Sequence, residues 1–408
     1  MQHYLTAKEA ADALGVTKAT LYAYTSRGQL RSQPAPGQPR ERRYYRGDIE
    51  RLQERKEARR DPATVAARGL HWGSPVLESG ITLIENGRLH YRGQDAVQLA
   101  ETASLEQAAE LLWSAQAAER ERLFAQTSGL PPALLARLRS CSKDPFTLLQ
   151  AVLPIAGAVD PTSYDLRPAA VRRTGARILR LLTTLAAGRD SQDPIHLALQ
   201  AGWAAKKPAA GSAIRTALVL SADHELNVSA FAARCAASAL ASPYDVVSAA
   251  LATLKGNRHG GATERVSSLF AEVETSRRAR TVVASRLRRG ELIPGFGHPL
   301  YPAGDPRATL LLHLAQNSGN EAEWRLVGSL RKAGAELLHD HPNLDFALVA
   351  VARAYRLPER APLLMFALGR TVGWLAHAIE QYADGNLIRP RARYTGPAPE
   401  AGATECFK

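Results

Sequence analysis

Residues 290–307 read GELIPGFGHPLYPAGDPR, and this stretch constrains the fold more than any other part of the sequence. Four glycines and four prolines in 18 residues are incompatible with a regular helix or strand, so a shaped loop is predicted. Gly295 and Gly297 lie just before His298. Because glycine has no side chain, these two residues would let the backbone approach a ligand on both sides of the intervening phenylalanine.

A helix is predicted to begin where this loop ends. Asp305 is a favoured N-cap residue, Pro306 suits the first helical position, and Arg307 would lie in the first turn. The backbone N–H groups at such a helix start favour an anion. A histidine, a bent loop and an arginine in this order would hold a polarised carbonyl group beside a carboxylate, although a loop of this kind is more often a simple connection.

Length and composition indicate an ordinary globular protein of two or three domains. The chain has 408 residues, of which 45% are hydrophobic, 22% charged and only 6% aromatic, which fits a large, mainly helical core. Three cysteines lie far apart and form neither a disulfide framework nor a zinc-binding pattern, so we expect a cytoplasmic protein. Residues 361–379 are the most apolar late stretch, but Arg370 and His377 interrupt them and no signal peptide is apparent, so no membrane association is expected.

Positive charge is concentrated near the N-terminus. The net charge is +13, and residues 1–60 hold 13 Lys and Arg against 7 Asp and Glu. This asymmetry predicts a basic N-terminal module. Thr6 and Glu9 form a capping box for a first helix, and Gly15 marks a turn before a second helix capped by Thr17.

The pattern of that module resembles the winged helix-turn-helix of MerR-like and excisionase-like DNA-binding domains. It comprises LTAKEAADALGVTKATLYAYTSRGQL, from residue 5, and RRYYRGDIERL, from residue 42. The resemblance implies that the second helix, over residues 18–24, enters a major groove and that the wing contacts phosphate. The implied contact residues are Thr17, Lys18, Thr20, Tyr22, Arg40, Arg42 and Arg43. We expect weak DNA binding by residues 1–60; the alternative is a small protein-interaction module of the same fold.

Two histidines lie in sequence patterns that are typical of an active site. His224 lies within SADHELNVS, residues 221–229, together with an asparagine and a serine. His259 precedes two glycines in KGNRHGGA, residues 255–262, where a loop is predicted to turn into a helix. A helix N-terminus disfavours protonation of an imidazole, so His259 would be a neutral electrophile there. A core histidine and a glycine turn are the ordinary structural alternatives.

An aspartate and an arginine stand in apolar surroundings. Asp345 lies between leucine and phenylalanine in HPNLDF, residues 341–346, so partial desolvation would raise its basicity. Arg370 lies in the apolar helix FALGRTVGW, residues 366–374, and needs an anion or a carboxylate as partner. The structural alternative for Asp345 is a helix cap.

These motifs resemble, in their order along the chain, the citrate synthase family, including its 2-methylcitrate synthases. The motifs are HGGA, GFGHPLY with DPR, HPNLDF and FALGRTVGWLAHAIEQ, within a match over about residues 68–396. The resemblance implies a mainly α, two-domain all-helical fold preceded by the winged helix-turn-helix domain. The implied parts are the winged domain (1–60), a linker (61–75), a large domain (76–260 and 346–408) and a small domain (261–345).

The resemblance also implies a reaction and a set of site residues. The family condenses acetyl-CoA with oxaloacetate and water to citrate and CoA, without a metal and without a permanently bound cofactor. By this resemblance Asp345 removes the methyl proton, His259 hydrogen bonds the thioester carbonyl and His298 polarises the ketone. Four further residues would bind oxaloacetate: His224, Arg307, Arg370 and, from the other subunit of a homodimer, Arg389.

Two departures from the family pattern affect the expected coenzyme A site. Asn257 and Arg258 stand where the family often has Pro-Leu, and Pro302 stands where it often has a basic residue. The catalytic assignment is unaffected. Lys255 or Arg258 is expected to take the place of the missing anchor for the nucleotide.

Three functions therefore stay open. A citrate synthase is the leading expectation. A 2-methylcitrate synthase would use propionyl-CoA instead, and one methylene group is worth only about 1–3 kcal/mol of discrimination. A DNA-binding regulator could use the same fold to sense oxaloacetate or acyl-CoA. The three residues His259, His298 and Asp345 favour an enzyme, because a sensor needs no base.

Overall fold

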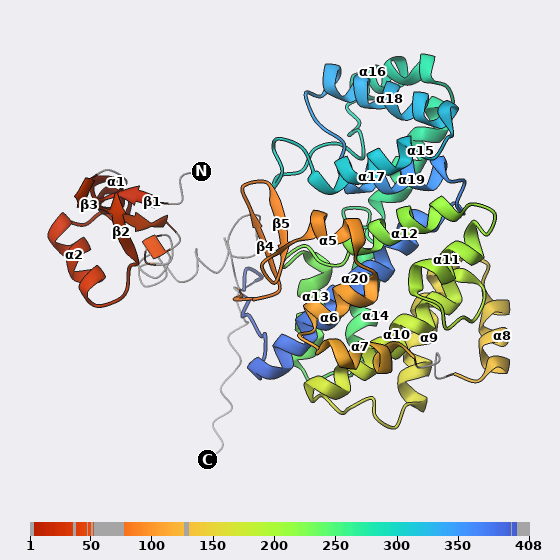
Figure 1. Ribbon diagram of the computed structural model, residues 1–408, viewed down its shortest axis with the longest axis horizontal. Coiled ribbons are helices and arrows are strands. Elements are labelled where there is room, and N and C mark those ends of the chain that lie inside the picture. The colour runs from red at the N-terminus through yellow and green to blue at the C-terminus, as the bar shows by residue number, and fades with distance from the viewer. Residues whose placement is uncertain are drawn as a thin grey trace. The chain divides into compact units, whose positions relative to one another are not determined.

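The structure is a computed structural model that describes residues 4–35, 38–46, 48, 49, 52, 77–125, 130–392 and 394–397. The chain divides into two compact units, Met1–Glu78 and Ser79–Lys408, which Figure 1 shows as a small and a large body. The linker predicted over residues 61–75 lies outside the described residues, as does the side chain of Arg40.

The first unit contains the predicted pair of helices and a small sheet. Its elements are β1 (Tyr4–Thr6), α1 (Ala7–Leu14), α2 (Lys18–Ser26), β2 (Ser32–Ala35) and β3 (Gln38–Tyr45). The strands pair antiparallel in the order β1-β3-β2, so β2 and β3 form the wing. Thr6 and Glu9 form the expected capping box and Gly15 has a φ of 57°. The second helix ends two residues later than the predicted residue 24.

The second unit opens with a hairpin. Strands β4 (Thr82–Glu85) and β5 (Arg88–Tyr91) pair antiparallel around Asn86 and Gly87, whose φ angles are 54° and 71°. Positive φ at both loop residues is typical of a tight two-residue hairpin turn, in which Asn-Gly is favoured. β6 (Gln94–Asp95) completes the sheet.

The rest of the second unit is helical (Figure 1). Its helices are α5 (Ala96–Thr102), α6 (Leu105–Leu112), α7 (Ala117–Phe124), α8 (Pro132–Cys141), α9 (Pro145–Val159), α10 (Pro168–Ala187), α11 (Ile195–Trp203), α12 (Pro208–Leu220), α13 (Val228–Ser238), α14 (Pro243–Leu254), α15 (Ala262–Val273), the 3₁₀ turn Ser276–Arg278, α16 (Ala279–Arg288), α17 (Pro306–Gln316), α18 (Glu321–Leu337), α19 (Leu344–Ala354) and α20 (Ala361–Asp384). In Figure 1, α15 to α19 gather at one end of this unit.

Helix α20 lies at the centre of the second unit and packs against α10, α12, α13 and α14. Two of its glycines allow close packing: a Cβ on Gly369 would lie 2.4 Å from the carbonyl oxygen of Leu218, and one on Gly373 would lie 2.3 Å from that of Ala222. These contacts fix α12 and the loop after it against α20. The helix is long and apolar enough to cross a membrane, but 94% of its most apolar window is buried inside the protein, as a core helix would be.

Candidate active site

Side chains from three loops, from the first turns of α17 and α19 and from the middle of α20 meet in the second unit. His224, after α12, has its Nε2 3.0 Å from the hydroxyl of Tyr301. The ring of His298 lies 5.0 Å from the ring of His224 and 5.0 Å from that of Tyr301. The guanidinium of Arg307 lies 5.2 Å from the centre of the Tyr301 ring. The structure thus brings together residues that the sequence predicted separately.

The loop over residues 290–305 is shaped by packing against other protein segments. Gly295 and Gly297 have φ angles of 89° and 73°, and a Cβ on them would lie 2.9 Å from Val266 Cγ2 and 2.5 Å from Asp340 Oδ2. The sequence predicted that a ligand approaches these glycines closely; in the structure, other segments of the protein approach them. The backbone N–H of Asn343 donates to the Gly295 carbonyl at 2.9 Å, so this loop is tied to the segment that precedes Asp345.

Arg307 and Asp305 form a bidentate ion pair in which both side chains are buried. Nε of Arg307 donates to Oδ1 of Asp305 at 2.9 Å and Nη2 donates to Oδ2 at 2.8 Å. Asp305 also caps α17, so the anion expected at this helix start is its own carboxylate. Burial alone would raise the pKa of Asp305, but the charge and the hydrogen bonds of Arg307, together with a contribution from His298, outweigh it and lower that pKa below the usual value. Nη1 of Arg307 makes no hydrogen bond with the described residues and can bind a second carboxylate.

Asp345 lies in the first turn of α19, which Asn343 caps through a bond from the Phe346 N–H. Its Oδ1 is buried and has no hydrogen-bond partner among the described residues. Burial raises the pKa of Asp345 to about 7, and the nearby positive charges of Arg307 and Arg370 offset only part of that effect. An unpartnered carboxylate with this pKa is suited to accept a proton near neutral pH.

His259 lies in the turn between α14 and α15, and its carbonyl accepts from the N–H of Ala262, at the start of α15. Its Nε2 lies 2.7 Å from the hydroxyl of Ser229, which also accepts a bond from the indole N–H of Trp374 at 3.0 Å. Burial, followed by the charge of Arg370, lowers the pKa of His259 to about 3. The imidazole is therefore neutral, as the sequence predicted, although burial rather than the helix dipole is the main cause.

His298 is also neutral at ordinary pH. Burial and the neighbouring charge of Arg307 lower the pKa of His298 to about 4. Its Nδ1 accepts a hydrogen bond from the Leu300 N–H at 3.2 Å, so the ring hydrogen is on Nε2. Burial lowers the pKa of His224 well below its ordinary value, and Arg307 and Arg370 lower it further.

Arg370 is a second buried guanidinium. Nε donates to the carbonyl of Ser221 at 2.8 Å, and the group lies 4.9 Å from the centre of the Phe366 ring. Burial lowers the pKa of Arg370, with the negative charge of Asp223 acting in the opposite direction. Arg370 has no carboxylate within ion-pair distance among the described residues. The negative charges of Asp223 and Asp345 act on it from a greater distance.

Three predicted binding residues lie outside this cluster. Lys255 and Arg258 are exposed, and neither forms an ion pair with the described residues. Arg389 is exposed, follows α20, and forms no hydrogen bond or ion pair within the described part of its own chain.

Ser229, Tyr301 and Trp374 were not predicted from the sequence to have a role in the site. All three lie inside quoted motifs, five residues after His224, three after His298 and four after Arg370. Spacing alone does not identify them, because their partners lie 30 to 145 residues away in the chain. The one available signal was that each is a hydrogen-bonding side chain within a motif of otherwise assigned residues.

Known proteins and domain families match both units. The family described as citrate synthase, C-terminal domain, matches residues 69–391, and a helix-turn-helix domain family matches residues 4–57. The chain is 31% identical over 366 residues to citrate synthase 2 of Bacillus subtilis (strain 168), covering 81% of this chain and 96% of that protein. It is 39% identical over 189 residues to the putative citrate synthase 2 of Mycobacterium tuberculosis (strain ATCC 25618 / H37Rv), covering 45% of this chain and 51% of that protein.

Solved structures share the fold of the second unit. The crystal structure of citrate synthase from Thermotoga maritima MSB8 superposes with a TM-score of 0.70 at 28% identity, covering 80% of this chain and 94% of that one. The crystal structure of citrate synthase from Pyrobaculum aerophilum superposes with a TM-score of 0.68 at 26% identity, covering 79% of this chain and 90% of that one. Such relatives indicate an acyltransferase-type enzyme that carries out a condensing reaction. The motifs, the fold and these matches together show that the chain belongs to the citrate synthase family and carries a helix-turn-helix domain at its N-terminal end.

Proposed function

We propose that the protein is a citrate synthase that condenses acetyl-CoA with oxaloacetate and water to citrate and CoA. The observation that carries this proposal is one cluster that combines an unpartnered carboxylate of raised pKa with two neutral histidines and two buried arginines. The carboxylate is needed to remove a weakly acidic proton. The two histidines are needed to stabilise two oxygens, and the two arginines are needed to bind a dicarboxylate.

The first step is enolisation of the thioester. Asp345 removes a methyl proton, and His259 donates a hydrogen bond to the oxygen on which negative charge develops. His259 can donate from Nδ1 only if its Nε2 accepts from Ser229. Ser229 has one hydrogen, which its geometry allows it to give either to His259 or to Asn227 Oδ1, 2.8 Å away. The proposed reaction requires the first arrangement, with Trp374 donating to Ser229.

Oxaloacetate is bound on the other side of the cluster. Nη1 of Arg307 and the guanidinium of Arg370 bind its carboxylates, and His224 supplies a further contact. His298 donates from Nε2 to the ketone oxygen, which makes the ketone carbon electrophilic. The enolate carbon bonds to this carbon and the oxygen takes a proton. Water then attacks the thioester carbonyl, the C–S bond breaks and CoA leaves with a proton.

Assembly and substrate contacts extend this proposal. Arg389 is proposed to reach the site of the other subunit of a homodimer, because it has no partner among the described residues of its own chain. Lys255 or Arg258 is proposed to bind the nucleotide of coenzyme A. The proposed large domain comprises residues 76–260 and 346–408, and the small domain comprises residues 261–345. His259 and Asp345 would then lie at the two points where the chain passes from one domain to the other.

Steady-state release of free CoA by the full-length protein tests the proposal. With oxaloacetate present, acetyl-CoA is expected to give the higher kcat/KM and propionyl-CoA a lower one. A higher kcat/KM with propionyl-CoA would identify a 2-methylcitrate synthase built from the same residues. No CoA release with either substrate would contradict both assignments.

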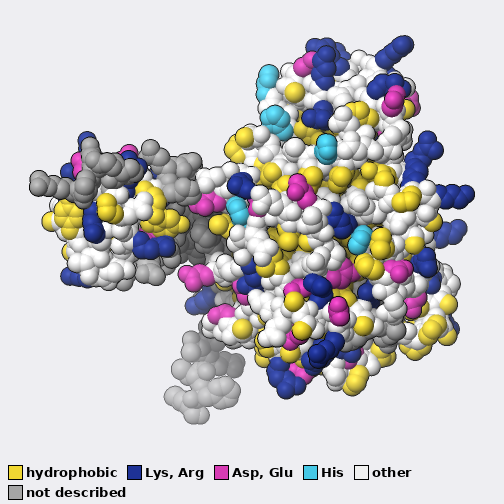
Figure 2. Space-filling view, in the orientation of Figure 1, with side chains coloured by type: hydrophobic (Ala, Val, Ile, Leu, Met, Phe, Trp, Pro, Cys, Tyr) yellow, Lys and Arg dark blue, Asp and Glu magenta, His cyan; other side chains and the backbone are white. Residues whose placement is uncertain are grey.

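The helix-turn-helix unit is proposed to bind DNA weakly. Tyr22 on α2 is 52% exposed although it is a large aromatic residue, and Arg42 on the wing is exposed as well. On the face shown in Figure 2, basic side chains of the second unit are interspersed with acidic ones. The DNA proposal concerns the first unit.

A gel-shift titration over a range of salt concentrations tests this binding. Full-length protein is expected to shift a duplex at low salt and to lose it steeply as salt rises, because phosphate contacts release counterions. Changing Arg40, Arg42 and Arg43 together to alanine is expected to flatten the salt dependence. A chain that begins near Ala66 is expected to lose DNA binding and keep its activity. Absence of any shift at low salt would favour a protein-interaction role.

A further inference from the structure

A buried row of polar side chains links α13 and α20 to the loop that carries His224. Asp223, His377 and Arg234 are each at most 3% exposed. Nε of Arg234 donates to Nδ1 of His377 at 2.9 Å, and Nε2 of His377 lies 3.3 Å from Oδ1 of Asp223. Oδ2 of Asp223 accepts from the hydroxyl of Thr82 at 2.6 Å. None of these side chains is assigned to the reaction, although Asp223 directly precedes His224.

The bond from Arg234 determines where the His377 ring carries its hydrogen. A guanidinium can only donate, so Nδ1 of His377 must accept and bears no hydrogen. The ring is therefore neutral, with its hydrogen on Nε2, the atom that faces Asp223. The guanidinium itself is fixed, because Nη1 donates to Oε1 of Gln381 at 3.3 Å and Nη2 donates to Oε2 of Glu380.

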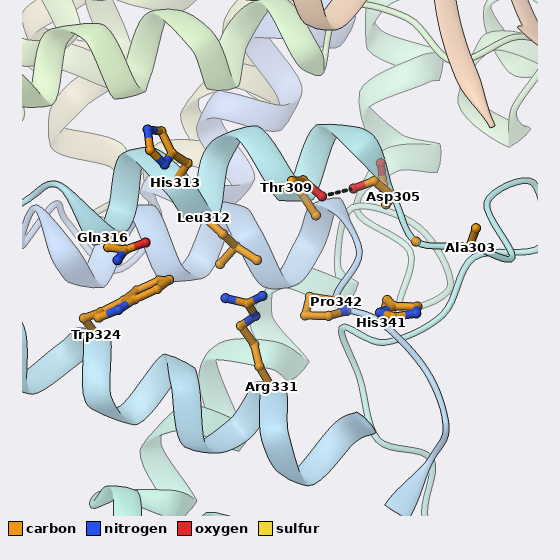
Figure 3. Close-up of a pocket in the computed structure, with 12 residues that line it drawn as sticks. Ala303, Asp305, Thr309, Leu312, His313, Gln316, Trp324, Arg331, His341 and Pro342 are labelled. Carbon is orange, nitrogen blue, oxygen red and sulfur yellow. Dashed lines mark hydrogen bonds between the residues drawn. The ribbon is translucent and has the colours of Figure 1, made fainter. Parts of the chain in front are cut away.

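The two arginines proposed to bind oxaloacetate are supported in different ways. Arg307 is paired directly with Asp305, which Figure 3 shows at the start of α17. Arg370 instead donates from Nε to the carbonyl of Ser221. Burial lowers the pKa of Arg370, and the charge of Asp223 is the largest effect in the opposite direction. The placement of the Asp223 carboxylate therefore matters for Arg370.

The backbone next to His224 is held through the same aspartate. The N–H of Asp223 donates to the hydroxyl of Tyr91 at 3.2 Å, and the carbonyl of Ala222 accepts from the N–H of Gly373 at 3.0 Å. A Cβ on Gly373 would lie 2.4 Å from Oδ1 of Asp223, so the carboxylate lies directly against α20. A shift of this carboxylate would therefore move the segment that leads into His224.

We propose that His377 is a positioning residue for oxaloacetate binding. Held by Arg234, it fixes the carboxylate of Asp223, and Asp223 in turn positions His224 and places a negative charge near Arg370. This role rests on the proposed function, because the residues that it positions are those assigned to oxaloacetate. His377 itself is not proposed to contact a substrate, so its loss should affect oxaloacetate more than acetyl-CoA.

Calorimetric titration of the full-length protein with oxaloacetate tests this role. His377→Leu removes both the acceptor for Arg234 and the hydrogen that faces Asp223, and it is expected to weaken binding by at least about tenfold. His377→Gln can still accept and donate, so its affinity is expected to stay within about threefold of normal. Thr371→Val is the matched control, because Thr371 is buried in the same helix and its hydroxyl donates to a carbonyl of that helix. Its affinity for oxaloacetate is expected to be unchanged.

Steady-state kinetics separates positioning from a loss of folded protein. His377→Leu is expected to raise the KM for oxaloacetate and to leave the KM for acetyl-CoA almost unchanged, whereas a smaller folded fraction would lower only the apparent kcat. If His377→Leu does not fold, Thr82→Val removes the bond to the other oxygen of Asp223 from a half-buried strand residue. It is expected to weaken oxaloacetate binding several-fold, and unchanged binding would overturn the role of Asp223.

NMR of protein labelled with the heavy nitrogen isotope in its histidine rings tests the arrangement without substrate. The His377 signals, identified by their absence from the spectrum of His377→Gln, are expected to show a neutral ring with its hydrogen on Nε2. A charged ring, or a hydrogen on Nδ1, would overturn the arrangement. Normal oxaloacetate affinity in His377→Leu, or equal losses in the Leu and Gln variants, would overturn the positioning role. Absence of oxaloacetate binding by the unaltered protein would contradict the proposed function itself and, with it, this role.

Discussion

Arg307 and Asp305, two residues apart in the chain, form a buried bidentate ion pair that leaves Nη1 of the arginine without a hydrogen-bond partner among the described residues. Asp305 also accepts from the N–H of Leu344. One carboxylate thus orients the arginine assigned to oxaloacetate and fixes the start of the helix that carries Asp345. The positions of the residues proposed to act on the two substrates therefore depend on this pair.

Removal of the charge of Asp305 should test that dependence. Asp305→Asn keeps the shape of the helix cap but leaves Arg307 buried without a counter-charge, so a loss of stability of about 3–5 kcal/mol is expected. The KM for oxaloacetate is expected to rise as well. Denaturant unfolding and steady-state kinetics measure the two effects. Asp144→Asn, at the N-cap of α9, is the control and should change stability by less than about 1 kcal/mol; an equal loss in both variants would contradict the account.

The pH dependence of the reaction should report Asp345. Because burial raises the pKa of Asp345 to about 7, the kcat/KM for acetyl-CoA is expected to fall as pH decreases through about 7. His259 and His298, with pKa values of about 3 and 4, remain neutral in this range. A profile that stays flat from pH 5 to pH 8 would contradict the assignment.

The same pKa shift has a consequence for stability. The folded state binds the proton of Asp345 more tightly than the unfolded state, so this group contributes stability that is present at low pH and is lost as pH rises through about 7. Replacement by neutral asparagine removes that loss. Asp345→Asn is therefore expected to raise the melting temperature at pH 8 more than at pH 5. A larger increase at pH 5 would show that burial does not raise the pKa of Asp345.

Ser229 should act through His259. Ser229→Ala removes the group that fixes the ring tautomer, so kcat is expected to fall by about 10- to 100-fold, less than removal of an oxyanion donor can cost. The KM for oxaloacetate should change little. Ser238→Ala, at the far end of the same helix α13, is the control. Equal kcat values for the two variants would show that the tautomer is set by another group.

Local patterns in the sequence predicted the structure well where the interacting residues are close in the chain. The capping box of Thr6 with Glu9 and the cap at Asp305 both involve residues within three positions of one another. Contacts between distant segments could not be obtained in this way. Ser229 meets His259 across 30 residues, and only the packing of α13 and α20 brings this pair beside Trp374.

The candidate site was predicted from the order of its motifs, but its electrostatics needed the structure. A pKa depends on burial and on charges that approach in space, and neither can be calculated from neighbours in the sequence. The sequence anticipated the partial desolvation of Asp345 from its apolar neighbours. It assigned the neutrality of His259 to the helix dipole, whereas burial and Arg370 are the causes in the folded chain.

Arg389 should act in the active site of the other subunit. Arg389→Ala and His259→Ala are each expected to be inactive as homodimers. When the two are mixed and allowed to exchange subunits, the heterodimer contains one site with both residues intact, so activity should return. Mass spectrometry verifies that the heterodimer has formed. Absence of rescue in a verified heterodimer would place Arg389 in the site of its own chain or outside any site.

The role of Asp345 as the base can be measured through CoA release and calorimetric oxaloacetate binding for Asp345→Asn. CoA release should be lost, while oxaloacetate should bind within about tenfold of its normal affinity, because the base acts on the other substrate. Turnover of this variant at a near-normal rate would contradict the assignment.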